Sequence, residues 1–154
     1  MRVSEIMTNA AVIDAADDTL AEAARKMWKQ QTGSLLVTDG DDLVGIITER
    51  DILKAVATGT PLQEARISEV MTKDVVTVGP GTSLREAAKI MADRWIRHLP
   101  VLDGGKLVGI ISQRDLTGVL AGALNEPDAL QQLLEASELV RERRLRRIEH
   151  GVWD

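Results

Sequence analysis

The strongest constraint on the fold of this chain is an internal repeat. Displacing the sequence by 64 residues aligns positions 4–51 with positions 68–115 without a gap, and 21 of the 48 pairs are identical. The longest shared run is Leu-Val-Gly-Ile-Ile, which occurs at 43–47 and at 107–111. Two copies without a longer array favour a closed pair of repeats related by a pseudo-twofold axis over an open solenoid.

Each copy carries the same series of structural signals. β-Branched residues at 11–13 and 75–78 favour a strand, and the capping-box patterns Thr19 to Glu22 and Ser83 to Glu86 predict a helix start. Two further strands are expected at 34–37 and 43–47, and at 98–101 and 107–111, joined by the Asp-Gly pairs at 39–40 and 103–104. A second helix then begins after Thr48 or Ser112. The order β-α-β-β-α predicts an α+β fold with small sheets and helices on one face.

Composition excludes several classes of function. The 154 residues contain no cysteine, Phe or Tyr and only two histidines, and the net charge is −5. Thiolate metal sites, cysteine nucleophiles and a broad aromatic platform for nucleic-acid bases are therefore not expected. No P-loop, no HExxH motif and no recognised nucleophile–base pair occurs, so we expect a protein that is not an enzyme and has no metal site. The N-terminus resembles no secretory signal and no apolar run is long enough for a membrane span, so a cytoplasmic protein is expected.

At these residues the sequence resembles the CBS (cystathionine-β-synthase) domain family in its paired form, the Bateman module. The markers are residues 76–78 with Pro80, residues 97–101 with Asp103, and Leu-Val-Gly-Ile-Ile-[Thr/Ser]-x-Arg-Asp in both copies. The resemblance covers about residues 1 to 121 and implies two repeats packed sheet to sheet with pseudo-twofold symmetry. It also implies clefts that bind AMP, ADP, ATP or S-adenosylmethionine, and frequent dimerisation of modules. We expect repeats at 1–62 and 63–124 and a helical extension at 125–154.

Two hydroxyl–carboxylate pairs are the first candidates for ligand binding. Thr48 with Asp51, and Ser112 with Asp115, stand where a strand ends and a helix begins, a place with free backbone N–H groups and a positive dipole. A carboxylate one turn into the helix can accept hydrogen bonds from two ribose hydroxyls, and the family places ribose contacts at positions like Asp51 and Asp115. The alternative is purely structural, with Thr48 and Ser112 as N-caps and the aspartates stabilising the helix dipole.

Arg97 and His98 are candidates for phosphate binding. Arg97 can grip a phosphate in a fork, and His98 can donate to one, more strongly when protonated. The alternative is that both are simply exposed at a strand edge. Because the first copy has Gly33 and Ser34 at these positions, the two clefts should differ.

Weaker candidates surround these pairs. Arg114, like Arg50, could serve a phosphate or pair with an acid on its own helix. Backbone amides of Val12, Ile13, Thr77 and Val78 could read an adenine edge, although these residues are also expected in core strands. Trp28 and Trp95 could stack on a base, but packing at an interface is the favoured role.

The chain after the repeats predicts a helix from Pro127 to about Glu149, with Asn125 as its cap. The stretch from Arg141 to Arg147 could contact nucleic acid or an acidic partner, but a solvated face is favoured. We expect a regulatory module that requires no cofactor, takes an adenosine-type regulatory ligand and signals through a homodimer to an unknown effector. The alternatives are an interaction protein with non-binding clefts, or nucleic-acid binding through the arginine-rich stretch.

Overall fold

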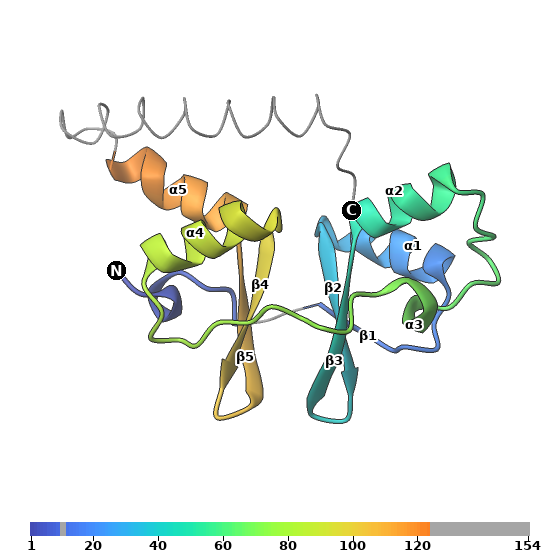
Figure 1. The fold of residues 1–154 in the computed structure, drawn as a ribbon, viewed down its shortest axis with the longest axis horizontal. Helices are drawn as coiled ribbons and strands as arrows, with labels where there is room; N and C mark the ends of the chain where they lie inside the picture. Colours follow the sequence, from blue (N-terminus) through green and yellow to red (C-terminus); the bar gives the residue numbers. More distant parts are fainter. Residues whose placement is uncertain (10–11, 124–154) are drawn as a thin grey trace. The chain divides into compact units, whose positions relative to one another are not determined.

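A computed structural model describes residues 1–9 and 12–123 of the chain. Residues Met1–Leu116 form one compact unit, and the described part of a second unit is the remainder of the last helix. The first repeat contains β1 (Ile13–Asp14), α1 (Leu20–Gln30), β2 (Ser34–Asp39), β3 (Asp42–Thr48) and α2 (Glu49–Ala57) (Figure 1). The second contains α4 (Leu84–Arg94), β4 (His98–Asp103), β5 (Lys106–Ser112) and α5 (Gln113–Ala123). Short helical turns, η1 (Val3–Glu5) and α3 (Ile67–Val70), lie at the start of the two repeats.

The hairpin of each repeat is built in the same way. β2 and β3 pair antiparallel, as do β4 and β5, and each pairing shifts register once, after Val37 and after Val101. Gly40 and Gly104 turn the two hairpins with φ of +59° and +56°, as the Asp-Gly signals predict. Thr48, the last residue of β3, pairs with Ser34, the first residue of β2. In the same way Ser112 at the end of β5 pairs with His98 at the start of β4.

The first strand forms in one repeat only. β1 runs parallel to β2, and the Leu36 N–H donates to the Val12 carbonyl at 3.0 Å. The strand expected at 75–78 is reduced to a single bridge between Val78 and Val101, which corrects the sequence prediction. The reason is Pro100, which occupies the position of Leu36 and has no N–H to donate to the preceding strand.

The helices begin where the capping patterns predict. Thr19 and Glu22 form a complete reciprocal box at the start of α1, whereas at α4 only Ser83 accepts, from the Glu86 N–H at 3.2 Å. Both helices end on a residue in left-handed conformation, at the equivalent positions Gln31 and Trp95. The apolar face of α1 is buried through Leu20, Ala23 and Met27, as its helical spacing predicts.

The two hydrophobic cores are completed by exchanged segments. Val3, at the start of the first repeat, is fully buried in the core of the second repeat, while its equivalent Ile67 is fully buried in the core of the first. The backbone follows the same exchange. The Val3 N–H donates to the Thr82 carbonyl at 2.8 Å, and the Ile67 N–H donates to the Asp18 carbonyl at 2.9 Å. Each repeat therefore buries the first segment of the other.

The exchanged segments then cross the hairpins at two equivalent glycines. Thr8 bridges Ile110 beside Gly109, and Thr72 bridges Ile46 beside Gly45. A Cβ atom at Gly109 would lie 2.8 Å from the Thr8 carbonyl oxygen, and one at Gly45 would lie 2.4 Å from the Met71 sulfur. Such separations are closer than real Cβ contacts, so glycine at 109 is favoured by the close approach of a backbone carbonyl, whereas at 45 the obstacle is a flexible side chain.

Among residues 1–9 and 12–123, no helix combines the length and the apolar character that crossing a membrane requires.

Candidate functional site

The junction between β3 and α2 holds the first hydroxyl–carboxylate pair. The Asp51 carboxylate accepts from both the backbone N–H and the hydroxyl of Thr48, at 2.8 and 3.0 Å, and both bonds use Oδ2. The Thr48 hydroxyl in turn accepts from the Asp51 N–H at 3.4 Å. This is a reciprocal capping box, so the structural role expected for these residues is present.

The junction between β5 and α5 repeats this arrangement. Oδ2 of Asp115 accepts from the backbone N–H and the hydroxyl of Ser112, both at 2.7 Å. Both carboxylates are half-buried, and Oδ1 of each accepts no hydrogen bond within the described part of the chain. The capping role therefore leaves one oxygen of each carboxylate available to a ligand hydroxyl.

Arg97 lies between the two helix starts. Its backbone carbonyl accepts from the Gln113 N–H at the start of α5, at 2.8 Å. Its guanidinium reaches the other repeat, where Nη2 donates to Oε1 of Glu49, the first residue of α2, at 2.7 Å. Both side chains are about half exposed, at 53% and 57%. Glu49 is a site residue that the sequence prediction missed.

His98 lies against the same ion pair. It pairs with Ser112 across the β4–β5 ladder and is half-buried. Burial lowers the pKa of His98, and the positive charge of Arg97 lowers it further, while Glu49 and Asp115 act in the opposite direction. The imidazole is therefore held in its neutral form near pH 7, where it can donate through one ring nitrogen and accept through the other.

In the first repeat, the smaller residues Gly33 and Ser34 occupy the positions of Arg97 and His98. A Cβ at Gly33 would lie 3.2 Å from the His98 ring and 3.3 Å from Oε1 of Glu49, so any larger residue would have to push these side chains back by a few tenths of an ångström. The Glu49 N–H donates to the Gly33 carbonyl at 3.0 Å, as the Gln113 N–H does to Arg97. Ser34 is buried, and its hydroxyl has no partner among the described residues. The two repeats thus carry different side chains at these positions.

The four residues predicted to line a base pocket, Val12, Ile13, Thr77 and Val78, differ in how their backbone groups are used. The Val78 N–H and carbonyl are both used within the sheet, by the Pro100 carbonyl and the Leu102 N–H. The Ile13 carbonyl accepts from the Lys26 ammonium, and the Val12 carbonyl accepts from Leu36. Thr77 is half-buried and lies beside Val78. For Val78, only the side chain is left to contact a base.

The remaining predicted contacts are all exposed. Arg114 is exposed and forms no ion pair within the part of the chain that the structure describes, and the same holds for Arg50. Trp28 is 80% exposed on α1, whereas Trp95 is 37% exposed at the end of α4. The stretch from Arg141 to Arg147 and the helix expected from Pro127 lie outside the described residues.

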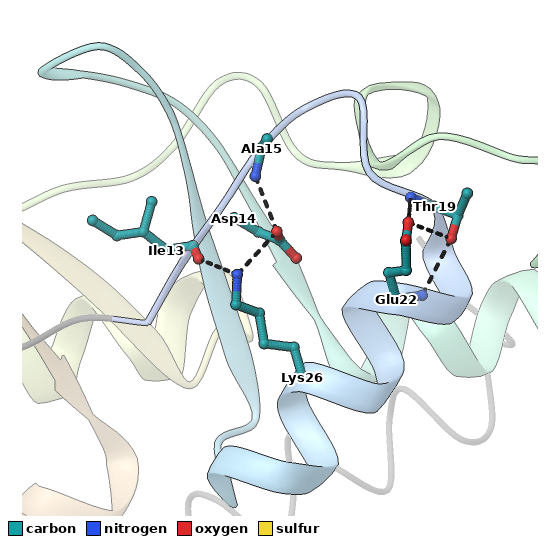
Figure 2. A network of polar contacts seen from close by, with 6 residues as sticks. All are labelled: Ile13, Asp14, Ala15, Thr19, Glu22 and Lys26. Atoms are coloured by element: carbon teal, nitrogen blue, oxygen red, sulfur yellow. Dashed lines mark hydrogen bonds and ion pairs between the residues drawn. The ribbon is translucent and has the colours of Figure 1, made fainter.

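A second polar cluster, also missed from the sequence, lies in the first repeat between β1 and α1. Figure 2 shows Lys26 reaching from α1 to the Ile13 carbonyl, at 2.7 Å, and to the Asp14 carboxylate, at 3.1 Å. Asp14 is buried, and its Oδ2 has no hydrogen-bond partner among the described residues. A hydrogen bond to Asp14 is the main cause that raises the pKa of Asp18, because a protonated Asp18 can donate to that carboxylate.

No group of three or more metal-ligating side chains occurs within residues 1–9 and 12–123.

Comparison with protein families gives two matches to the CBS domain, over residues 3–58 and 67–122. An uncharacterised 17.7 kDa protein of Acidianus ambivalens is 42% identical over 121 residues, which cover 77% of this chain and 73% of that protein.

Two solved structures are similar in fold and sequence. A putative signal-transduction protein with CBS domains from Burkholderia ambifaria is 37% identical, with a TM-score of 0.75, over 78% of this chain and 93% of that one. The CBS domain pair of the protein MJ0100, in complex with 5′-methylthioadenosine and S-adenosyl-L-methionine, is 29% identical, with a TM-score of 0.73. That match covers 80% of this chain and 98% of the other.

Proposed function

The chain belongs to the CBS domain family as a tandem pair, a type of regulatory module, and on this premise we propose that it senses an adenosine-type ligand. The observation that carries the proposal is the pair of equivalent carboxylates, Asp51 and Asp115. Each uses Oδ2 to cap its helix and keeps Oδ1 for a further donor. Two vicinal ribose hydroxyls are donors that such an oxygen accepts.

Three further observations support a nucleoside ligand. The unpartnered hydroxyl of Ser34 is opposite Thr48 in the β2–β3 ladder, so a polar ligand group placed there would satisfy it. Neutral His98 adds a donor and an acceptor beside Ser112. The similar CBS domain pair of MJ0100 carries 5′-methylthioadenosine and S-adenosyl-L-methionine. The candidate ligands are therefore AMP, ADP, ATP, S-adenosylmethionine and 5′-methylthioadenosine.

The test is thermal unfolding with each of these ligands for the wild type, Asp51→Asn and Asp115→Asn. Asparagine keeps an oxygen for the helix cap but places an amide donor where the free acceptor was, so the fold is retained while ribose binding is lost. A ligand at 100 times its Kd adds about 2.7 kcal/mol to folding, which raises Tm by several degrees. A shift that disappears in one variant identifies the working site. The absence of any shift at about 1 mM ligand, several times a typical regulatory Kd, overturns the proposal.

We further propose that two copies of the chain associate through the helices of the first repeat. Trp28 on α1, and Leu53 and Val56 on α2, are 80%, 69% and 57% exposed, and large apolar side chains exposed on neighbouring helices are the kind of surface that a protein partner covers. Light scattering should give twice the chain mass for the wild type and one chain mass for the Trp28→Ser/Leu53→Ser variant. A monomeric wild type at 100 µM, a concentration well above common dimer constants, contradicts this assembly.

A further inference from the structure

The ion pair between Arg97 and Glu49 joins the two repeats at the point where both candidate sites meet. Glu49 stands two residues before Asp51, and Arg97 precedes His98, which pairs with Ser112. Nη2 of Arg97 and Oε1 of Glu49 are 2.7 Å apart. The guanidinium charge of Arg97 is therefore already matched by a carboxylate of this chain.

The position of the Glu49 carboxylate is set by its surroundings. Its backbone N–H is bound to the Gly33 carbonyl at 3.0 Å, which fixes the first residue of α2. Gly33 has no side chain, so Oε1 of Glu49 and the His98 ring both approach its Cα region. Both partners of the pair remain about half exposed, so a bound ligand can reach either charge.

This arrangement has opposite consequences for anionic and cationic ligands. A phosphate that binds Arg97 must either compete with Glu49 for Nη2 or use the other guanidinium N–H groups, and in both cases it lies beside the negative charge of Glu49. A sulfonium or ammonium centre at the same place is instead attracted to Glu49, and an uncharged thioether is not opposed. An exposed ion pair is weak and can be broken, but repulsion between the carboxylate and a phosphate dianion persists after the bond has been broken.

We propose that Glu49 sets the charge preference of the ligand site, so that it disfavours phosphorylated adenosine and favours neutral or cationic adenosine compounds such as thioethers and sulfonium ions. The inference rests on the proposed function, because it concerns the same site. The repeat itself supplies the informative substitution, since the second copy has Gln113 where the first has Glu49.

The experiment is calorimetric titration of wild type and Glu49→Gln with adenosine and with AMP, two ligands that differ only by the phosphate. In the variant the affinity ratio of AMP to adenosine should rise about tenfold, as expected when one like charge is removed from a partly exposed site. The affinity for adenosine should change less than about twofold, and S-adenosylmethionine should bind more weakly. Glu49→Ala serves as a second variant if Glu49→Gln does not fold.

Glu64→Gln is the matched control, because Glu64 is exposed, lies in the turn after α2 and its loss changes the net charge equally. An equal rise of the ratio in this control would reduce the effect to overall charge and overturn the inference. An unchanged ratio in Glu49→Gln overturns it while leaving the proposed function intact, since adenosine still binds. Failure of both adenosine and AMP, together with failure of S-adenosylmethionine, overturns the proposed function and the inference with it.

A second readout needs no ligand. Because Glu49 raises the pKa of His98 in opposition to burial and to Arg97, NMR titration of Glu49→Gln should show a lower pKa for His98 than in the wild type. An unchanged pKa would mean that Glu49 does not lie at the cluster in solution, and would overturn the inference.

Discussion

At Asp14 the first repeat places a carboxylate with a 2% exposed side chain inside an otherwise apolar layer. Burial of a charge is costly unless a partner matches it, and Lys26 supplies that partner from α1 (Figure 2). The second repeat has Val78 and Ile90 at the two equivalent positions, and both pack into its core. The same structural place is thus filled by an ion pair in one copy and by two aliphatic side chains in the other.

We expect Lys26→Met to destabilise the protein by about 1 to 3 kcal/mol, because it leaves the Asp14 carboxylate buried without a cation. The double variant Asp14→Val/Lys26→Ile should recover to within about 1 kcal/mol of the wild type or exceed it, since it copies the second repeat. Urea unfolding of the three proteins measures both effects. A double variant that is less stable than Lys26→Met would show that the pair is required for more than charge compensation.

His98 should make stability depend on pH. Its folded pKa is lowered, first by burial and then by Arg97, whereas in the unfolded chain it titrates near 6.5. As pH falls below about 6.5, the unfolded state takes up the proton first, so the free energy of unfolding decreases until the folded pKa is reached. Unfolding at pH 7.5 and pH 5.5 should show this loss in the wild type, and His98→Gln should show less of it. Equal losses in the two proteins would contradict a lowered pKa at His98.

Local patterns predict residues whose partners are close in sequence. Thr48 with Asp51 and Ser112 with Asp115 were identified because a hydroxyl and a carboxylate three residues apart, between a strand and a helix, form a local pattern. Glu49 was missed because its partner Arg97 lies 48 positions away. A comparison of the two copies could have indicated the pair. Glu49 stands where the second copy has Gln113, and Arg97 stands where the first copy has Gly33. The ligand roles of the site residues remain predictions.

At the scale of elements, the prediction of a strand at 75–78 was wrong, because only Val78 pairs with a neighbouring strand. β-Branched side chains indicate extended backbone, but a ladder also needs donors on the neighbouring strand, and Pro100 removes one. Helix starts were predicted well because their determinants are local. The exchange of the segments that begin the two repeats, at Val3 and Ile67, could not be predicted. The alignment of the two copies does not show which core each segment enters.

The two crossing glycines should respond differently to alanine. At Gly109 the nearest obstacle is a backbone carbonyl fixed in a bridge, whereas at Gly45 it is the flexible Met71 side chain, which can rotate away. We expect Gly109→Ala to cost roughly 2 to 3 kcal/mol and Gly45→Ala less than about 1.5 kcal/mol. Thermal unfolding of the pair measures the difference. The reverse order would mean that Met71 cannot move and that the Thr8 segment can.

At the scale of the whole molecule, the exchanged segments make the stability of each repeat depend on residues assigned to the other. Val3→Ala removes two buried methyl groups from the core of the second repeat and should cost about 2 kcal/mol. Its amide chemical-shift changes should be largest near Leu99 and Val101, not near Leu35. Val75→Ala, at a half-buried valine outside both cores, should cost less than about 1 kcal/mol. Shift changes centred on the first repeat would contradict the exchange.

The exchange also bears on how such a chain can arise. A single ancestral copy has a core that its own leading segment does not fill, so two separate chains would have to lend each other that segment, as in a swapped homodimer. Joining the two genes end to end would preserve each of those contacts and alter only the linker around residues 58–66. The tandem protein is then a dimer made permanent by one covalent bond. In one joined chain the two halves need not be identical, and here they differ at Asp14 and Lys26 and at Glu49 and Arg97.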